Sequence, residues 1–208
     1  MTRCFVPTTP SSGNCYKVRL LLTLLEIPFE RIELDVVDRS NRPEILGGKN
    51  PALRVPTLEL EDGTYLAESN AILWYFADGT PYLPHDRLER ARVLQWMFFE
   101  QYDVEPNLAV ARFLVSILGE REEYAERLEE KWKAGYRALD GMERHLDGRA
   151  FLVGERMSIA DIALYAYTHV AEEGGFDLDR YPNIRGWLSS TESAGACSHA
   201  GLTAIVIP

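Results

Sequence analysis

The chain has 208 residues, of which 46% are hydrophobic and 26% charged, and 22 Lys and Arg against 32 Asp and Glu give it a formal net charge of −10. This composition is typical of a folded globular protein and argues against extended disorder. A surface this acidic repels nucleic-acid phosphates and anionic lipids, so we expect neither nucleic acid nor a membrane as partner. No apolar signal segment follows the initiator methionine, and we expect a cytoplasmic location.

The spacing of cysteine and histidine argues against a metal site or a disulfide framework. The three cysteines, Cys4, Cys15 and Cys197, form no CxxC pair and no zinc-ligand pattern. The four histidines have no metal-ligand spacing either. We therefore expect no metal.

The first part of the chain alternates strand-like and helix-like segments. Residues 4–6 read as a short apolar strand, and a turn over 11–14 supplies side chains that cap helices. An almost entirely apolar helix follows over 18–25, and 29–34 reads as a second strand. This order predicts a parallel strand–helix–strand crossover.

A hairpin and another helix complete the first predicted domain. Residues 40–48 read as a short irregular helix that ends in two glycines. Strands over 57–60 and 65–67 flank Asp62 and Gly63, a pair that favours a tight hairpin turn, and a helix continues from Ser69. Residues 1–78 therefore predict an α/β domain of the form βαβ–ββα.

Glycine and proline mark the boundary to a second, all-α domain. The segment 79–84 contains two prolines and a glycine, so we predict a linker over 79–86 and a helical domain over 87–208. Ser158 and Asp161 have the spacing of a capping box, for which we expect a structural role. The predicted helices are 87–118 with a bend at Pro106, 120–146, 158–173 and 184–190.

Four stretches carry a further pattern: 11–19 (SSGNCYKVR), 50–58 (NPALRVPTL), 68–72 (ESNAI) and 151–161 (FLVGERMSIAD). Together, in this order and at this spacing, they resemble the cytosolic glutathione transferase superfamily. The first stretch is most similar to the serine-type classes, theta-like and zeta-like. The resemblance implies a thioredoxin-like, glutathione-binding domain followed by a helical domain, and glutathione S-transferase activity without a metal.

The first stretch offers a hydroxyl for thiol activation. A free thiol has a pKa of about 8.5, and lowering it by about two units requires roughly 2.7 kcal/mol of preferential thiolate stabilisation. A hydroxyl that donates to sulfur at the positive end of a helix can supply it. Ser12 lies in the turn before the apolar helix, so we predict Ser12 as the catalytic residue, with Ser11 as a rival. Either serine would also suit a helix cap.

Cys15 is a rival of another kind. A helix N-terminus acidifies a thiol, and Cys15 could then form a mixed disulfide with glutathione, as in cysteine-type members of the superfamily. The alternative is a buried cysteine that acts as a small hydrophobe.

Two segments are predicted to bind glutathione. The residue before a proline is biased to extended geometry, which leaves the backbone N–H and C=O of Val55 open to an extended peptide. The resemblance implies that Pro56 is cis and that Val55 pairs with the cysteinyl part of glutathione; a proline that only starts a strand is the alternative.

Glu68 and Ser69 open a helix, where Ser69 and backbone N–H groups suit a carboxylate and Glu68 suits an ammonium. Those are the charges of the γ-glutamyl end, and a plain helix cap is the alternative.

Three further residues, Arg54, Lys49 and Asn41, are predicted to bind the glycyl carboxylate or the peptide backbone, against the alternative of solvated surface positions. The first long helix faces the active site in the superfamily, so the resemblance places Tyr102 and Arg112 near a hydrophobic substrate.

Trp74 and Phe76 lie on different sides of their helix, which favours a homodimer that covers both.

We therefore expect a glutathione transferase that holds the glutathione thiol as a thiolate and conjugates it to a small hydrophobic electrophile. Two alternatives stay open: glutathione-dependent reduction of peroxides or disulfides at the same site, and a non-catalytic binding module of the same fold.

Overall fold

The computed structural model describes residues 2–7, 12–34 and 37–195. The described residues divide into two compact units, one within Met1–Thr80 and the other within Pro81–Ala196. In this part of the chain no helix is long and apolar enough to cross a membrane. The sequence-based domain and linker ranges stay predictions.

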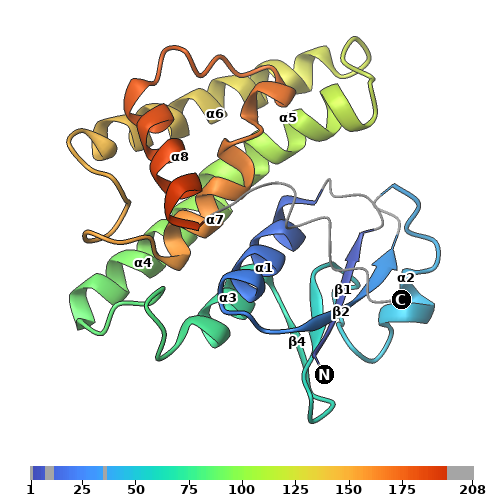
Figure 1. Cartoon of the computed structure of the whole chain (residues 1–208). Helices are drawn as coiled ribbons and strands as arrows, with labels where there is room; N and C mark the ends of the chain where they lie inside the picture. The colour runs from blue at the N-terminus through green and yellow to red at the C-terminus, as the bar shows by residue number, and fades with distance from the viewer. Residues whose placement is uncertain (1, 8–11, 35–36, 196–208) are drawn as a thin grey trace. The chain divides into compact units, whose positions relative to one another are not determined.

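A four-stranded mixed sheet forms the centre of the first unit (Figure 1). β1 pairs in parallel with β2 and antiparallel with β3, and β3 pairs antiparallel with β4. α1 (Gly13–Leu24) connects the parallel pair, which confirms the predicted crossover. The strands, in sheet order, are β2 (Phe29–Leu34), β1 (Thr2–Pro7), β3 (Thr57–Glu59) and β4 (Tyr65–Ala67).

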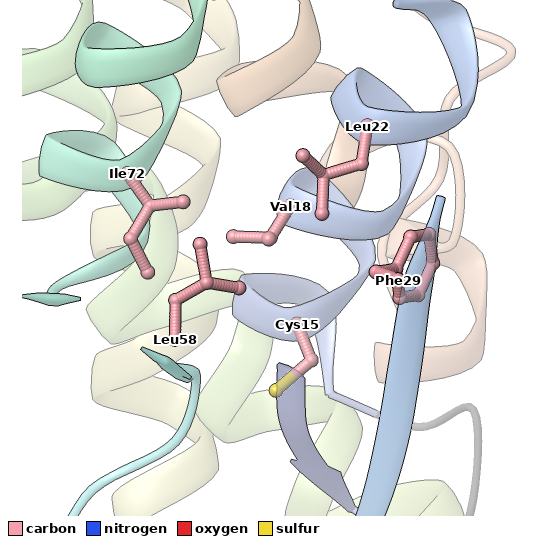
Figure 2. Close-up of a cluster of buried hydrophobic side chains, with 6 residues drawn as sticks. All are labelled: Cys15, Val18, Leu22, Phe29, Leu58 and Ile72. Atoms are coloured by element: carbon pink, nitrogen blue, oxygen red, sulfur yellow. The ribbon is translucent and has the colours of Figure 1, made fainter. Parts of the chain in front are cut away.

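Helices cover both faces of this sheet (Figure 1). α1 and α3 (Ser69–Ala77) pack against each other on one face, and α2 (Arg42–Leu46) lies on the other. Between the α1–α3 pair and the sheet lies a core cluster, shown in Figure 2, and Leu34 and Leu46 form a smaller cluster on the α2 side. The members of the larger cluster are Cys15, Val18, Leu22, Phe29, Leu58 and Ile72.

The second unit is helical, as predicted, and its first helical run changes winding. α4 (Arg87–Phe99) continues into a π-helical segment, η1 (Glu100–Ala109), then α5 (Val110–Arg112) and a second π-helical segment, η2 (Phe113–Ile117). Pro106 lies inside η1 and has no N–H to donate, so one bond of the α-helical ladder is unavailable there. The predicted extent of this run is confirmed.

The later helices differ from their predicted bounds. α6 (Ala125–Leu146) starts five residues later than predicted, and α7 (Ile159–Thr168) gives way to a short 3-10 helix, η3 (Ala171–Gly174). α8 (Pro182–Gly195) extends beyond its predicted span at both ends. Its N-terminus is stabilised by Glu143 of α6, whose carboxylate accepts from the backbone N–H groups of Asn183 and Ile184, each at 3.0 Å.

The predicted capping box at the start of α7 is confirmed. Ser158 caps the helix, and the Asp161 carboxylate accepts from the Ser158 backbone N–H at 2.8 Å. Asp161 is fully buried and also accepts from the Leu152 backbone N–H at 2.8 Å. Its role is structural, because it fixes the approach of the preceding loop to α7.

Candidate active site

Ser12 occupies the N-cap position of α1. Its backbone is extended, with φ −80° and ψ 111°, and its Oγ accepts from the Cys15 backbone N–H at 3.3 Å. This cap explains why α1 begins at Gly13, five residues before the predicted start. One hydroxyl both accepts hydrogen bonds and donates one, so accepting from the Cys15 N–H does not itself use the Ser12 hydrogen. The cap and the thiolate-stabilising role are therefore compatible in one side chain.

Cys15 lies in the core cluster, with its side chain between α1 and the sheet (Figure 2). It is fully buried, and burial raises the pKa of its thiol from 9.0 to about 12. A hydrogen bond with Ser12 and the charges of Arg19, Arg42 and Arg31 act in the opposite direction, but burial outweighs them. At neutral pH Cys15 is therefore a protonated, water-excluded thiol, which is a poor nucleophile.

The Val55–Pro56 peptide bond is cis. Val55 is half-buried, and its backbone N–H and C=O make no hydrogen bond to any described residue. The open backbone groups are those that an extended peptide could pair with, in the manner of an added strand.

A buried asparagine supports the loop that leads to Val55. Asn50 Nδ2 donates to the Arg54 carbonyl at 2.9 Å and to Thr57 Oγ1 at 3.0 Å. The Thr57 hydroxyl donates to the same carbonyl at 2.8 Å, and Asn50 Oδ1 accepts from the Ala52 N–H at 3.0 Å. This network fixes the backbone on both sides of the cis bond.

The N-termini of α1 and α3 meet through side chains. Ser69, the first residue of α3, is buried and donates from Oγ to Asn14 Oδ1 at 3.0 Å. Lys17 donates to the same Asn14 oxygen at 2.8 Å and lies 3.4 Å from Ser69 Oγ. Because the first N–H groups of a helix have no intrahelical acceptor, this junction favours a negatively charged group.

Glu68 precedes this junction in an unusual backbone conformation. It is exposed, with φ 68° and ψ 114°, and its carbonyl accepts the first helical bond of α3, from Ile72. A side chain other than glycine at positive φ costs energy, and such strain is concentrated at functional sites. The conformation is consistent with the predicted role of Glu68 in binding an ammonium.

The other predicted glutathione-binding residues lie between β2 and β3. Asn41 is exposed at the N-cap position of α2, where its side chain makes no capping bond, and Arg54 is exposed. Lys49 donates to the Ile45 carbonyl at 2.6 Å, which holds its ammonium at the end of α2. Among the described contacts, none joins these three side chains to Ser69. Ser11 lies outside the described residues.

Tyr102 and Arg112 belong to the second unit. Tyr102 lies in η1 and is 76% exposed. Arg112 forms an ion pair with Glu173, with 2.6 Å between Nε and Oε2. Their predicted place beside a substrate stays a prediction. In the described segments, no group of three or more His, Cys, Asp or Glu is placed to hold a metal ion.

Asn14, Lys17 and Asn50 were not singled out from the sequence. The sequence does contain an indication for Lys17, because a charged residue directly before the apolar run of α1 is unusual enough to need a partner. Asn14 and Asn50 stood inside the recognised stretches, but nothing in their local sequence shows which residues far along the chain they contact.

Comparison with known proteins decides the family. Residues 11–78 match the model of the glutathione S-transferase N-terminal domain, and residues 107–193 match that of the C-terminal domain. The chain is 31% identical over 209 residues to the disulfide-bond oxidoreductase YfcG of Escherichia coli (strain K12), covering 96% of this chain and 94% of that protein. The chain belongs to the glutathione S-transferase family.

Solved structures agree with this family assignment. A glutathione S-transferase from Pseudomonas fluorescens Pf-5 is 50% identical, with a TM-score of 0.88 over 92% of this chain and 94% of that one. A second Pseudomonas fluorescens Pf-5 family member, solved with two glutathione molecules bound, is 25% identical with a TM-score of 0.79, over 97% and 92% of the two chains. The fold is therefore a thioredoxin-like glutathione S-transferase N-terminal domain followed by the helical C-terminal domain.

Proposed function

We propose that this glutathione S-transferase family member is a serine-type transferase, which binds glutathione in its first unit and transfers it to a small hydrophobic electrophile. The hydrogen bond between Ser69 and Asn14 is the main support for this function. It brings the start of α1, which Ser12 caps, together with the start of α3.

In this proposal the peptide lies along Val55 in extended form. The open N–H and C=O of Val55 pair with the cysteinyl residue, and Ser69 with the first turn of α3 binds the γ-glutamyl carboxylate. Glu68 accepts from the γ-glutamyl ammonium. Asn41, Lys49 and Arg54 are the proposed contacts of the glycyl end.

The chemistry belongs to Ser12 and the bound thiol. The Ser12 hydroxyl donates to the glutathione sulfur, which favours the thiolate over the thiol. The thiolate attacks an electrophilic carbon, a C–S bond forms, and the leaving group departs with its electron pair. Tyr102 and Arg112 are the proposed residues on the electrophile's side.

Disulfide reduction is the second candidate, and the likeness to the YfcG oxidoreductase favours it. Here the bound thiolate attacks a disulfide, forms a mixed disulfide and releases one thiolate; a second glutathione thiolate then releases the other. Cys15 has no part in this route, because its thiol is buried and protonated.

One set of measurements separates these functions. We expect retention on immobilised glutathione and turnover of 1-chloro-2,4-dinitrobenzene that Ser12→Ala reduces. Turnover of hydroxyethyl disulfide without conjugation would support the reductase instead. Binding without either turnover would support a non-catalytic module, and no binding would refute glutathione as the co-substrate.

We further propose a homodimer. Several large apolar side chains are exposed on α4 and η1, and the four-residue spacing of Leu94, Phe98 and Tyr102 places these three on one side of the run. Tyr75 of α3 is also 55% exposed. Exposed apolar stripes of this kind mark interaction surfaces. The exposed members on α4 and η1 are Leu88, Leu94, Phe98 and Tyr102.

We also propose a cytoplasmic location, where an unpaired thiol such as Cys15 stays reduced.

A further inference from the structure

Lys17 is a fully buried lysine on α1. Its ammonium lies 2.8 Å from Asn14 Oδ1, 3.4 Å from Ser69 Oγ and 3.5 Å from Asn70 Oδ1. Asn14 stands in the first turn of α1, and Ser69 and Asn70 stand in the first turn of α3. Lysine is almost never fully buried without such partners, because removing an ammonium from water is costly. Its charge is thus fixed at the junction of the two helices.

The Lys17 ammonium allows the Ser69 hydroxyl to change its hydrogen-bond partner. Ser69 has one hydroxyl hydrogen, which it gives to Asn14 Oδ1 at 3.0 Å. That oxygen also accepts from Lys17 at the shorter distance of 2.8 Å. When the Ser69 hydroxyl turns toward a ligand, Asn14 Oδ1 keeps the Lys17 bond, and no buried acceptor loses its last donor. Ser69 can therefore change partner at little cost.

Lys17 also determines the charge of the ligand that Ser69 prefers. Ser69 Oγ can accept from the ammonium while donating outward, which orients its hydrogen toward an acceptor. The positive charge of Lys17 adds to that of the N-terminal end of α3, and both favour an anionic acceptor over a neutral one.

We propose that Lys17 is the positioning residue that makes the Ser69 subsite selective for a carboxylate. The inference rests on the proposed function, in which that carboxylate is the α-carboxylate of the γ-glutamyl residue of glutathione. Lys17 acts through Ser69 and Asn14, and its charge supplies the preference for a carboxylate.

The test compares two ligands. One is glutathione; the other is 4-aminobutanoyl-cysteinylglycine, which has hydrogen in place of the γ-glutamyl α-carboxylate. Calorimetry on the full chain gives the ratio of the two affinities for wild type, Lys17→Met, Lys17→Gln and Lys17→Arg. Lys133→Met, which removes a charge from an exposed position on α6, is the control.

We expect wild type to prefer glutathione by about 10- to 100-fold, the usual size of a hydrogen bond to a charged group. Lys17→Met and Lys17→Gln should lower this ratio to within about threefold of one, while Lys17→Arg and Lys133→Met keep it. A merely structural role would weaken both ligands alike and leave the ratio unchanged.

Three results would overturn the inference: a wild-type ratio near one, a ratio unchanged in a folded uncharged variant, or a ratio lost in Lys17→Arg. The first and third results can be obtained even if the uncharged variants, Lys17→Met and Lys17→Gln, do not fold. Wild-type binding of both ligands with equal affinity would leave the proposed function standing, whereas binding of neither would refute that function as well.

Discussion

The indole N–H of Trp187 donates a hydrogen bond of 2.9 Å to Asp161 Oδ1, between two fully buried side chains of α8 and α7. The same carboxylate accepts from the backbone N–H groups of Leu152 and Ser158. One acidic residue therefore joins the loop before α7, the cap of α7 and α8.

Removing this carboxylate should destabilise the second unit. Asp161→Ala leaves several buried donors without an acceptor, and we expect a loss of about 3 kcal/mol in the free energy of unfolding. Urea denaturation measures it. Asp147→Asn, at an exposed position after α6, should change stability by less than about 0.5 kcal/mol. Equal effects of the two substitutions would contradict the assigned role.

Ser12→Ala should raise the pKa of the bound glutathione thiol, because the thiolate loses a hydrogen-bond donor. The pH–rate profile for conjugation should move to higher pH, and turnover at neutral pH should fall by about 10²-fold. The lost cap should also cost about 1 kcal/mol of stability. Ser12→Thr keeps a hydroxyl and should retain the profile. An unshifted profile in Ser12→Ala would remove Ser12 from the mechanism.

The Cys15 thiol should resist alkylation in the folded protein. Its pKa of about 12, raised from 9.0 by burial, lowers the thiolate fraction at pH 8 by about 1,000-fold. Iodoacetamide labelling with peptide mapping should show slow modification in buffer and ordinary modification in urea. Fast labelling in the native state would restore Cys15 as a redox candidate.

The same pKa shift predicts how stability depends on pH. The folded state keeps the thiol proton to a higher pH than the unfolded state does, so the unfolded state loses it first. This contribution to stability is full below about pH 9 and is lost as the pH rises toward about 12. Cys15→Ala should flatten the stability curve in that window, which alkaline urea titrations would measure.

Glu68→Gly should make the protein more stable and bind glutathione less well. Glycine relieves the positive φ of 68°, with an expected gain of about 1 kcal/mol, but the group proposed to bind the ammonium is lost. Glu26→Gly is a matched control, because Glu26 also has a positive φ, 54°, at the end of α1. It should gain stability with unchanged affinity. Wild-type affinity in Glu68→Gly would refute the binding role.

Phe98→Glu should dissociate the proposed dimer. Phe98 is 60% exposed on α4, and a carboxylate there opposes burial against a second copy. Light scattering at micromolar concentration should give the mass of two chains for wild type and of one for the variant. Lys133→Glu, a larger change in charge at an exposed position on α6, should stay dimeric. A wild-type mass of one chain would refute the dimer itself.

Local sequence patterns predict the strand–helix–strand order, the hairpin and the Ser158 capping box well, because the groups that form them are neighbours in the chain. The start of α8 is different. Its cap comes from Glu143, some forty residues earlier, so no local pattern could place it.

The same distinction holds within the candidate site. Ser12, Val55 and Ser69 stand out through their place before a helix or a proline. Lys17 and Asn14 matter through contacts more than fifty residues away, and only the folded chain brings these together.

The strand order also bears on how copies of the chain can associate. Among the strands that the structure describes, β2 and β4 are the two edges of the sheet. β4 is three residues long, and half of the residues of β2 (FERIEL) are charged. Short edges and charged edges both resist the addition of a strand from another molecule. Growth of the described sheet from one copy of the chain into the next is therefore opposed at both of these edges.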